Sequence, residues 1–593
     1  MLSKNIKKFF KIIKIAKKKK EINCIDYYTC INKKISNYSP EVILVILYLI
    51  YSARHGHSCI PKKHFVKKKI KRKNVFIKLL NIVSKNNINW FNTVISSMLC
   101  SNGTQKTPLV IDKKYIYLYK YWYSENKIIE LLYQKKSKKK KNKIEYKKLI
   151  KKYCSNYIDK NQKNAVKKAL IHNLFFLLGG PGTGKTNIIA YLILILIKIS
   201  KKKIKIQLTA PTGKAVNKLT QSIYKILKKK NIQKNEKKMI PKEGITLHKL
   251  FKIQKETNKN NAKYIKRKKK IDILIIDESS MISLNIMEII LTCIKKKTKI
   301  IFVGDVYQLP SVETGSILKK ICNFKKKKKE KKKIFFVLKK NYRFNKNSGI
   351  NFLINQLKKK KIKDINKIYK KKYKDIIWKN LNTSNDYLNM LKKIKLYYKK
   401  YWNYVNKKKN PKKIIHKFNK YRILCIINKG IFGTKKINQY LDNYFIKINN
   451  KKKKKEFWYH GKPIIIKKNN IFLKLMNGDI GICLYKKKKK KIYFLLSTGK
   501  IKKFNPEILF HYKTAWSTTI HKSQGSEFLS VNIIIPNYFS NKFSKELFYT
   551  AISRAQKKVT IYANKKILNK IINNNKERYS GLKKKIEELN IFS

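Results

Sequence analysis

Short apolar runs separated by longer mixed stretches dominate the middle of the chain. Residues 174–178 are all apolar, which indicates a strand buried on both faces, and an apolar helix is expected from about Asn187 after a glycine-rich turn. Further strand-like runs at 204–209, 271–276 and 299–303 each lead into polar or acidic residues. Strands of this kind, alternating with helical segments, predict a parallel sheet covered by helices, and so an α/β fold.

The flanking regions carry different patterns. Residues 1–155 are mostly helical in pattern, and 42–53 is apolar on nearly every face, as expected of a buried helix. Residues 345–415 are lysine-rich and helical in pattern. A strand at 422–427 begins a second α/β unit, and 456–512 alternates short strands with glycine turns, which predicts a small β insertion in that unit.

The turn after the first strand has the spacing of a phosphate-binding loop. It reads Gly-Gly-Pro-Gly-Thr-Gly-Lys-Thr and fits the pattern G-x-x-x-x-G-K-T. Glycines let backbone N–H groups point at a polyphosphate, and the helix that follows adds the positive end of its dipole. A turn without a ligand is the alternative, but with 19 glycines in 593 residues the pattern should arise by chance in about one such chain in a hundred. The residues expected to hold a nucleoside triphosphate are Gly179, Gly180, Pro181, Gly182, Thr183, Gly184, Lys185 and Thr186.

Residues at three strand ends supply what phosphoryl transfer needs. Lys185 would reach the β- and γ-phosphates, and Thr186 and Asp277 would ligate Mg²⁺. Glu278 would polarise the attacking water as general base. The chain has only 30 acidic residues, so two adjacent carboxylates after an apolar strand are a strong signal, against the alternative of an acidic loop. After the next strand, Gln308 would sense the γ-phosphate.

Two further residues are candidates for the same site. Gln162 precedes the phosphate loop by seventeen residues and would present its amide to adenine, although an ordinary surface glutamine is the alternative. Arg343 stands out because only seven of the 147 basic residues are arginine. Lysine would serve for solubility, so a guanidinium at this position indicates a need for its planar geometry.

The formal net charge of +117 favours a polyanionic partner, which such a charge would bind at moderate salt. Much of the charge is nevertheless discounted. Lysine, isoleucine and asparagine are all abundant, which is the bias that an A+T-rich genome imposes through its codons. The lysine runs at 325–329 and 451–455 are therefore predicted to be solvated loops rather than recognition surfaces.

Cysteine usage and hydropathy limit the class of protein. Nine cysteines are scattered without a Cys-x₂-Cys pair, so zinc or iron–sulfur is not expected and the thiols should be reduced. Two histidines and a cysteine occur close together at 54–59, where a helix-ending turn is a better interpretation than a metal site. No uncharged apolar run reaches 18 residues, so we expect no membrane association and a cytoplasmic location.

The ordered motifs resemble those of superfamily 1 helicases, in the branch that translocates 5′ to 3′. The resemblance rests on GGPGTGKT, TAPTGKA, LIIDESSM, GDVYQLPSV and NYRF, followed by TTIHKSQGSEF and YTAISRA near the C-terminus. These motifs span about 159–560. Within the superfamily, Gly56-His57-Ser58-Cys59-Ile60 and the overall length are similar to the RecD-type alpha subunits of exodeoxyribonuclease V (RecBCD).

This resemblance implies an ATP-dependent 5′–3′ DNA helicase or translocase that works with RecB- and RecC-type subunits on single strands and duplex ends. ATP and Mg²⁺ would be the cofactors. Arg343 and Arg554 would act as arginine fingers from across the cleft. No nuclease is expected, since no further acidic cluster could hold two metals. Candidates for DNA contact, by motif position, are Thr212, Trp516, Thr518 and His521.

The alternative function is a stand-alone superfamily 1 helicase acting on DNA or RNA, which a leading domain without an interface would favour.

The expected architecture has two RecA-like P-loop helicase domains. The expected parts are an N-terminal α-helical partner-binding domain at 1–155, a RecA-like ATPase domain at 156–338, and a second RecA-like domain at 339–593 with an SH3-like β insertion at about 456–512.

Overall fold

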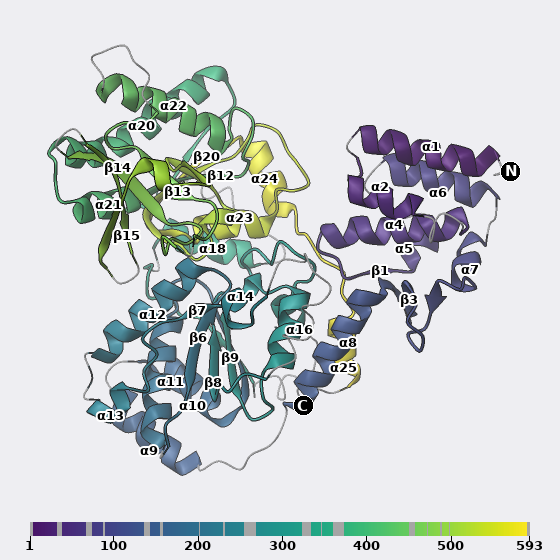
Figure 1. Ribbon diagram of the computed structural model, residues 1–593, viewed down its shortest axis with the longest axis horizontal. Coiled ribbons are helices and arrows are strands. Elements are labelled where there is room, and N and C mark those ends of the chain that lie inside the picture. The colour runs from purple at the N-terminus through teal and green to yellow at the C-terminus, as the bar shows by residue number, and fades with distance from the viewer. Residues whose placement is uncertain are drawn as a thin grey trace.

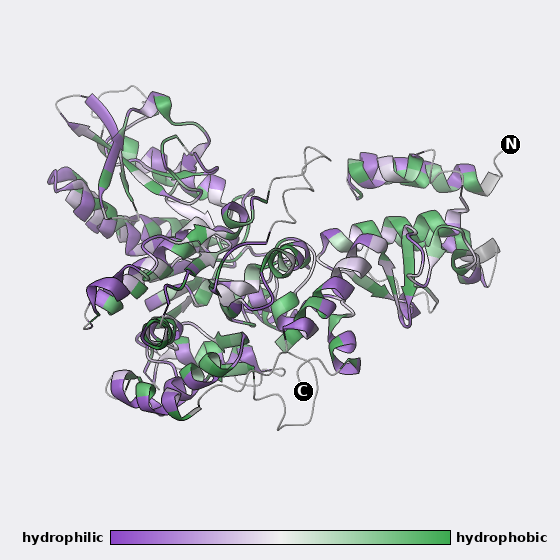
Figure 2. Cartoon of the chain, turned by 60° about the horizontal axis from the view of Figure 1, so that its bottom comes forward, coloured by the Kyte–Doolittle hydropathy of each residue, from purple (hydrophilic) through white to green (hydrophobic). Residues whose placement is uncertain are grey.

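The computed structural model contains two parallel sheets, an antiparallel sheet and a mixed sheet, with helices around them (Figure 1). Hydrophobic residues are concentrated toward the interior, while peripheral helices carry hydrophilic stretches (Figure 2). The structure describes residues 4–19, 21–32, 38–66, 74–86, 89–135, 143–154, 158–200, 202–228, 230, 232–253, 268–322, 334–345, 347–359, 373–449, 457–470, 472–486, 489–496 and 499–589.

The first sheet has six strands, all parallel. The strand β5 (Leu174–Gly179), second from one edge, follows the predicted apolar run, and its side chains alternate between two cores because successive residues of a strand point to opposite faces. Phe175 and Leu177 pack with α10 (Lys160–Ile171) and α11 (Lys185–Ile199), whereas Phe176 packs on the side of α16 (Leu284–Cys293). Across the sheet, the strands are β10 (Phe335–Leu338), β5 (Leu174–Gly179), β9 (Lys299–Gly304), β8 (Ile273–Ile276), β6 (Ile206–Ala210) and β7 (Ile245–Thr246).

Helices cover both faces of this sheet. The α9 helix, just before the expected domain boundary, contributes Tyr146, Ile150 and Cys154 to the same core as α10 and α11. Short helical and irregular segments complete the layer. The principal helices are α9 (Lys143–Cys154), α10 (Lys160–Ile171), α11 (Lys185–Ile199), α12 (Gly213–Lys228), α13 (Lys234–Lys237), α14 (Leu247–Leu250), α16 (Leu284–Cys293) and α17 (Ile317–Cys322).

The second sheet has five strands, again all parallel. Its helices form a layer on each face: α18, α23 and α24 pack on one core, and α20, α21 and α22 on the other. The strands across the sheet are β11 (Ile376–Lys379), β20 (Ala555–Tyr562), β19 (Phe528–Ile534), β12 (Tyr421–Cys425) and β18 (Ser517–Thr519). The helices are α18 (Gly349–Lys358), α20 (Ser384–Asn406), α21 (Pro411–Asn419), α22 (Thr434–Asn449), α23 (Lys545–Ile552) and α24 (Lys565–Asn573).

A five-stranded antiparallel sheet lies between α22 and β18 in the chain, where alternating strands and glycine turns predicted a β insertion. Glycines at its turns permit the tight reversals, as at Gly478, which has a φ of +96°. The strands across this sheet are β16 (Ile501–Phe504), β15 (Lys489–Leu495), β14 (Ile480–Lys486), β13 (Pro463–Ile466) and β17 (Tyr512–Thr514).

The leading part of the chain is helical around the buried helix α4, but it also contains a four-stranded sheet that the helical pattern did not predict. Its strands have only two to four residues, too few to establish an alternating pattern. The helices are α1 (Lys4–Lys18), α2 (Cys24–Ile31), α4 (Pro40–Arg54), α5 (Lys63–Val66), α6 (Asn74–Asn86), α7 (Trp90–Ile95) and α8 (Tyr119–Gln134). The strands across the sheet are β1 (Cys59–Pro61), β4 (Tyr115–Leu118), β3 (Leu109–Asp112) and β2 (Cys100–Ser101).

The C-terminal segment returns from the second sheet to the leading part (Figure 1). After α24, residues 574–581 cross to α25 (Leu582–Glu588), which packs beside α8. Glu125 of α8 is fully buried and accepts hydrogen bonds from Ser58 Oγ at 2.6 Å, Ser580 Oγ at 2.6 Å and the backbone N–H of Gly581 at 3.1 Å. Burial raises the pKa of this carboxyl.

The histidine-rich turn at 54–59 belongs to this junction. As predicted, it ends a helix: α4 stops at Arg54 and β1 begins at Cys59. His57 Nδ1 accepts a hydrogen bond from the Tyr579 backbone N–H at 3.0 Å, and the two rings stack. The turn therefore binds the returning C-terminal segment.

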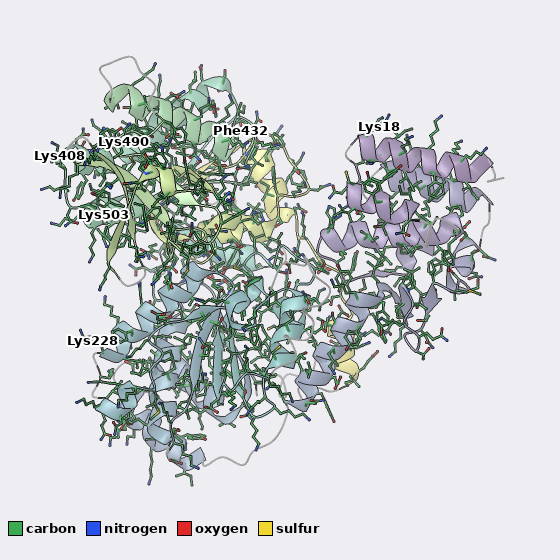
Figure 3. All side chains as sticks on the ribbon, in the orientation of Figure 1. Lys18, Lys228, Lys408, Phe432, Lys490 and Lys503 are labelled. Atoms are coloured by element: carbon green, nitrogen blue, oxygen red, sulfur yellow. The ribbon has the colours of Figure 1, made fainter. Side chains whose placement is uncertain are left out.

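Many lysine side chains lie at the periphery of the molecule (Figure 3), although Lys135, Lys299 and Lys462 are buried. Lys18, Lys228 and Lys408, for example, are exposed. The two lysine runs singled out from the sequence, 325–329 and 451–455, lie outside the described residues. Among the described helices, none combines the length and apolar character needed to cross a bilayer.

Gly56→Ala should lower the melting temperature of the protein. Gly56 has a φ of +89°, and an added Cβ would lie 2.3 Å from the Arg578 side chain, which donates hydrogen bonds to the carbonyls of Glu313 and Gly315. The strain should cost about 1 kcal/mol, and displacing Arg578 at least about 1 kcal/mol more.

Gly478→Ala is the matched control, measured by the same thermal melts. Gly478 has a φ of +96°, but an added Cβ there would have nothing within 4 Å. It should show the strain alone, and equal losses for both variants would contradict the contact between Arg578 and the turn.

Candidate nucleotide-binding site

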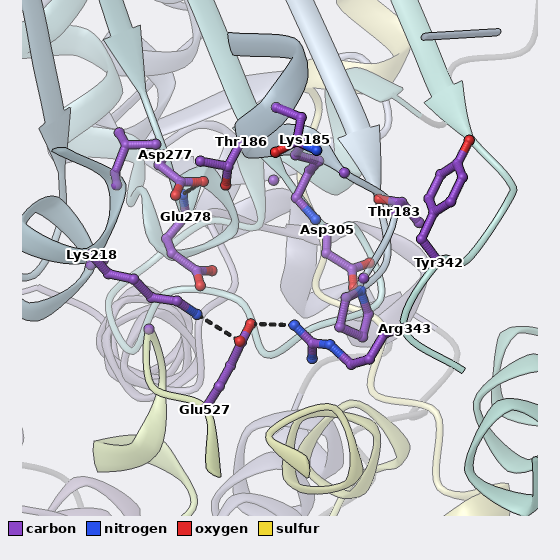
Figure 4. A pocket seen from close by; sticks show the side chains of 18 of the residues that line it. Thr183, Lys185, Thr186, Lys218, Asp277, Glu278, Asp305, Tyr342, Arg343 and Glu527 are labelled. Atoms are coloured by element: carbon purple, nitrogen blue, oxygen red, sulfur yellow. Dashed lines mark hydrogen bonds and ion pairs between the residues drawn. The ribbon is translucent and has the colours of Figure 1, made fainter. Parts of the chain in front are cut away.

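A cavity of about 720 Å³ lies at the carboxyl ends of the strands of the first sheet (Figure 4). This is the edge at which open α/β sheets place their ligands. Residues of the second-sheet unit, among them Glu527 and Arg554, close its other side. The predicted site residues that line it are Gln162, Pro181, Gly182, Thr183, Gly184, Lys185, Thr186, Asp277, Glu278, Gln308, Arg343 and Arg554.

The phosphate loop is shaped by its backbone. Gly182 and Gly184 have φ values of +74° and +81°, in the region that favours glycine. Thr183 Oγ1 donates to the Gly180 carbonyl at 2.9 Å and so fixes the curvature of the loop. Lys185 Nζ donates to the carbonyls of Gly179 and Gly180 at 2.7 and 2.9 Å. Those two residues thus lie behind the ammonium group instead of lining the cavity.

Gln162 is buried against this loop, not exposed as in the alternative interpretation. An added Cβ at Gly184 would lie 2.4 Å from its Nε2, and the same nitrogen donates to the Thr183 carbonyl at 3.4 Å. The preceding Asp159 caps α10 by accepting from the Gln162 backbone N–H at 2.7 Å. The cap and the loop together fix the position of the amide.

Asp277 and Glu278 follow β8 directly. Glu278 has a φ of +49° and donates its backbone N–H to Asp277 Oδ1 at 2.8 Å, so the chain turns sharply where the strand ends. Burial and the neighbouring Glu278 charge raise the pKa of Asp277 to about 6, and Lys185 opposes this shift. A buried carboxylate that ionises reluctantly would gain from a divalent cation. With the Thr186 hydroxyl in the same cavity, the oxygen donors fit Mg²⁺.

The loop after β9 joins the two sheets. Asp305 Oδ2 accepts a hydrogen bond from the Tyr549 hydroxyl at 2.8 Å, and the Leu309 N–H donates to Thr550 Oγ1 at 2.9 Å. Burial, with Asp305 beside it, raises the pKa of Tyr549 well above its usual range, so the hydroxyl remains a donor. Gln308 lies between these bonds, and its buried Oε1 has no hydrogen-bond partner among the described residues.

Arg343 lies where the chain crosses from the first sheet to the second. The preceding Tyr342 donates its N–H to the Gly182 carbonyl at 2.8 Å, whereas Phe344 is buried in the core of the second sheet. The expectation that Arg343 reaches across the cleft from the second unit is therefore wrong, because the backbone beside it is hydrogen-bonded to the phosphate loop.

Arg554 does come from the second unit and is buried at the end of α23. Its Nε donates to the Thr550 carbonyl and its Nη1 to the Ser526 carbonyl, both at 3.2 Å. Its Nη2 donates to Ser553 Oγ at 3.0 Å. The guanidinium is thus held in place at the cavity wall.

The candidates for DNA contact lie outside this cavity. Thr212 and Thr518 are half-buried and His521 is exposed, and their contact with nucleic acid stays a prediction. Trp516 is 0% exposed: it donates its indole N–H to Asp442 Oδ1 at 2.8 Å and stacks on Phe445. The prediction that Trp516 contacts a base is wrong, because its ring is enclosed by the second core.

Glu527 and Lys218 line the cavity but were missed by sequence reasoning. Glu527 Oε1 lies 2.7 Å from Arg343 Nη2, and Glu527 Oε2 lies 2.8 Å from Lys218 Nζ (Figure 4). Lys218 could not be singled out from the sequence, because lysine is so abundant in this chain. Glu527 could have been found, because acidic residues are scarce and this one belongs to the motif near 518–528.

Three family models match separate parts of the chain. A model for an AAA domain matches residues 162–314, which include the phosphate loop, Asp277 and Gln308. A model for a UvrD-like helicase C-terminal domain matches 514–562 in the second-sheet unit. A model for the N-terminal domain of the RecBCD enzyme subunit RecD matches 20–117 in the leading part.

Relatives are similar over nearly the whole length. The RecBCD enzyme subunit RecD of Buchnera aphidicola subsp. Acyrthosiphon pisum is 40% identical, over 95% of this chain and 98% of its own. That of Buchnera aphidicola subsp. Schizaphis graminum is 37% identical, over 93% and 98%. Among solved structures, the Pif1 helicase from Candida albicans matches with 19% identity and a TM-score of 0.38, over 73% of this chain and 98% of its own, and adds nothing to the assignment. On its extensive identity to the Buchnera proteins, the chain belongs to the family of RecD subunits of the RecBCD enzyme.

Proposed function

We propose that the protein is an ATP-dependent 5′–3′ DNA helicase, the RecD subunit of a RecBCD-type complex that unwinds duplex ends for recombinational repair. The observation that carries this proposal is the single cavity in which a phosphate loop, the Asp277–Glu278 pair and an arginine from the second unit meet. The family assignment supports the complex and its RecB- and RecC-type partners. The stand-alone helicase remains the alternative.

Each residue of the cavity has a role in holding and hydrolysing ATP. Lys185 would turn from the loop carbonyls to the β- and γ-phosphates, and Gln162 would face adenine. Thr186 and Asp277 would hold Mg²⁺, which neutralises phosphate charge when bound. Glu278 would accept a proton from the attacking water, and Arg343 and Arg554 would donate to oxygens of the departing γ-phosphate.

Hydrolysis would be coupled to movement through the loop after β9. Gln308 sits between two bonds to α23, from Asp305 to Tyr549 and from Leu309 to Thr550. A change in its contact with the γ-phosphate would therefore shift the second unit relative to the first. Closure around ATP and opening after hydrolysis would move the protein along single-stranded DNA.

The domain assignment follows from the same division of labour. We assign the binding of partner subunits to the leading part of the chain. Each parallel sheet belongs to one RecA-like unit, and the insertion is an SH3-like module. The boundary before the first RecA-like unit is best drawn ahead of α9, near residue 143, because this helix shares the core of α10 and α11. Contacts with the DNA strand would come from Thr212, Thr518 and His521.

Lys185→Gln should lower ATP hydrolysis by about two orders of magnitude or more while leaving the protein folded. The substitution removes a point charge from a loop that its backbone shapes. ATP turnover in the presence of single-stranded DNA is the measurement. Lys225→Gln, at an exposed position of α12, is the control and should behave as wild type. Equal turnover in all three proteins would refute the phosphate-loop assignment.

Arg343→Lys and Arg554→Lys should each lower turnover about 10³-fold, with a much smaller change in ATP affinity. Lysine keeps the charge but cannot hold two phosphate oxygens at once. The measurement is hydrolysis at saturating ATP, with melting curves alongside.

Arg422→Lys is the control for loss of a buried guanidinium. Arg422 donates to the Ala515 carbonyl at 2.7 Å and lies outside the cavity. It should lower stability without lowering turnover. Near-normal turnover in both cavity variants would show that the two arginines do not complete the site.

Binding of a non-hydrolysable ATP analogue with Mg²⁺ should weaken as the pH falls through about 6. Asp277 has its pKa raised to about 6, so the form that ligates the cation is present above this pH and lost below it. Between pH 7 and pH 5 the ionised fraction falls about tenfold. Asp277→Asn should remove this part of the dependence. An identical pH profile in mutant and wild type would contradict the assigned role.

A further inference from the structure

Glu527 is a negatively charged side chain in a cavity whose proposed ligand is a polyphosphate. The chain has 30 acidic residues against 147 basic ones, so a carboxylate at this position runs against the overall composition. Of the five acidic residues that line the cavity, Asp277 and Glu278 have roles in metal binding and proton transfer, Asp305 binds Tyr549 and Asp159 caps α10, so only Glu527 is left without a role. Its presence requires another explanation.

Glu527 joins the two halves of the site. It precedes β19 of the second sheet, and Gln556 of the same unit donates to its Oε2 at 3.2 Å. Its ion-pair partners lie on the other side: Lys218 comes from α12 of the first unit, and Arg343 from the crossover beside the phosphate loop. The carboxylate therefore ties the two sheets together across the nucleotide cavity.

The charges make this tie persistent. Burial opposes ionisation of Glu527, but the attraction of Lys218 and Arg343, with their hydrogen bonds, outweighs it and holds the pKa well below the usual range. Glu527 and Arg343 are also largely shielded, with 21% and 17% of their side chains exposed. Less solvent screening makes such a pair stronger than one on an open surface.

Arg343 is only half satisfied by this contact. Its Nη2 binds Glu527, while its buried Nη1 has no hydrogen-bond partner among the described residues. Buried guanidinium nitrogens are normally paired, so the free nitrogen points to a further anionic oxygen at this position. In the proposed function, that oxygen belongs to the γ-phosphate.

We propose that Glu527 is an ionic latch, which holds Arg343 and Lys218 when no triphosphate is bound and yields them to the γ-phosphate when ATP enters. This inference rests on the proposed function. One anionic partner replaces another, so both cations keep an anionic partner in both states. After the γ-phosphate leaves, the carboxylate takes Arg343 back, and ADP does not retain it. Glu527 is thus a positioning residue that acts through Arg343.

The latch predicts a selective gain in triphosphate affinity when its charge is removed. Glu527→Gln should bind a fluorescent, non-hydrolysable ATP analogue with Mg²⁺ about fivefold tighter or more, because no carboxylate has to be displaced. ADP, which lacks the displacing group, should gain less than about twofold. Loss of one negative charge from the cavity would by itself favour both nucleotides, and the triphosphate more because its charge is greater, so the Glu527→Asp variant, which keeps the charge, is needed to isolate the latch. Equilibrium titrations of the full chain with each nucleotide separate these effects.

Glu546→Gln is the matched control. Glu546 of α23 pairs with Lys319 of α17 at 2.9 Å, so it also joins the two units, but neither residue lines the nucleotide cavity. Its affinities for both nucleotides should stay at the wild-type values. Glu527→Asp is a second variant that keeps the charge and shortens the reach by one methylene. It should show an intermediate gain for the triphosphate, and it protects the test against misfolding of Glu527→Gln.

Three results would overturn the latch. They are a weaker triphosphate affinity in Glu527→Gln, which would mean that the carboxylate contacts nucleotide directly, an equal gain for ADP, or no change in either variant. The proposed function fails in a different way, with a wild-type chain that binds neither nucleotide or a Lys185→Gln variant that hydrolyses ATP normally.

Discussion

Two hydrogen bonds fix the positions of the two parallel-sheet units relative to each other. They join a loop of the first unit to a helix of the second. Asp305 accepts from Tyr549, and Leu309 donates to Thr550, so five residues of the first unit are fixed to one turn of α23. Both contacts are buried, where a hydrogen bond is strong and an unpaired group is costly. Arg554, at the end of the same helix, takes its place in the cavity because this contact positions α23.

The parts of the fold that depend on local pattern could be predicted from the sequence. The apolar run at β5 and the glycine spacing after it define a strand, a loop and a helix within a short segment, and their chemistry follows from residue type. The two-residue β7 and the short strands of the leading sheet carry too few residues for a pattern. Their pairing depends on distant partners that a single sequence does not reveal.

The errors at the site have the same origin. Trp516 has the amphipathic character of a base-stacking residue, but the aromatic cluster that encloses it comes from helices more than seventy residues away in the chain. Arg343 was placed on the wrong side because no pattern marks where a chain crosses between sheets. Glu527 shows its importance only when Lys218, from another unit, is seen beside it.

The arginines make specific contacts, unlike the many lysines that reflect only the composition of the chain. Five of the seven arginines lie at described positions, and each has a specific partner. Arg54 pairs with Asp26, Arg422 and Arg578 donate to backbone carbonyls, and Arg343 and Arg554 face the nucleotide cavity. In a chain whose composition favours lysine so strongly, guanidinium groups persist where their planar fork makes directed bonds.

The returning C-terminal segment limits how far the two parallel-sheet units can separate while its contacts hold. Asn574 is fastened to the second unit through Lys545 and Phe543, and Arg578 is fastened to the Gly315 carbonyl on the first. The four peptide steps between them span at most roughly 14 Å when fully stretched. The segment therefore acts as a tether, and the number of its residues sets its maximum length. In the proposed cycle, the extent of opening would be bounded by covalent geometry as well as by the nucleotide.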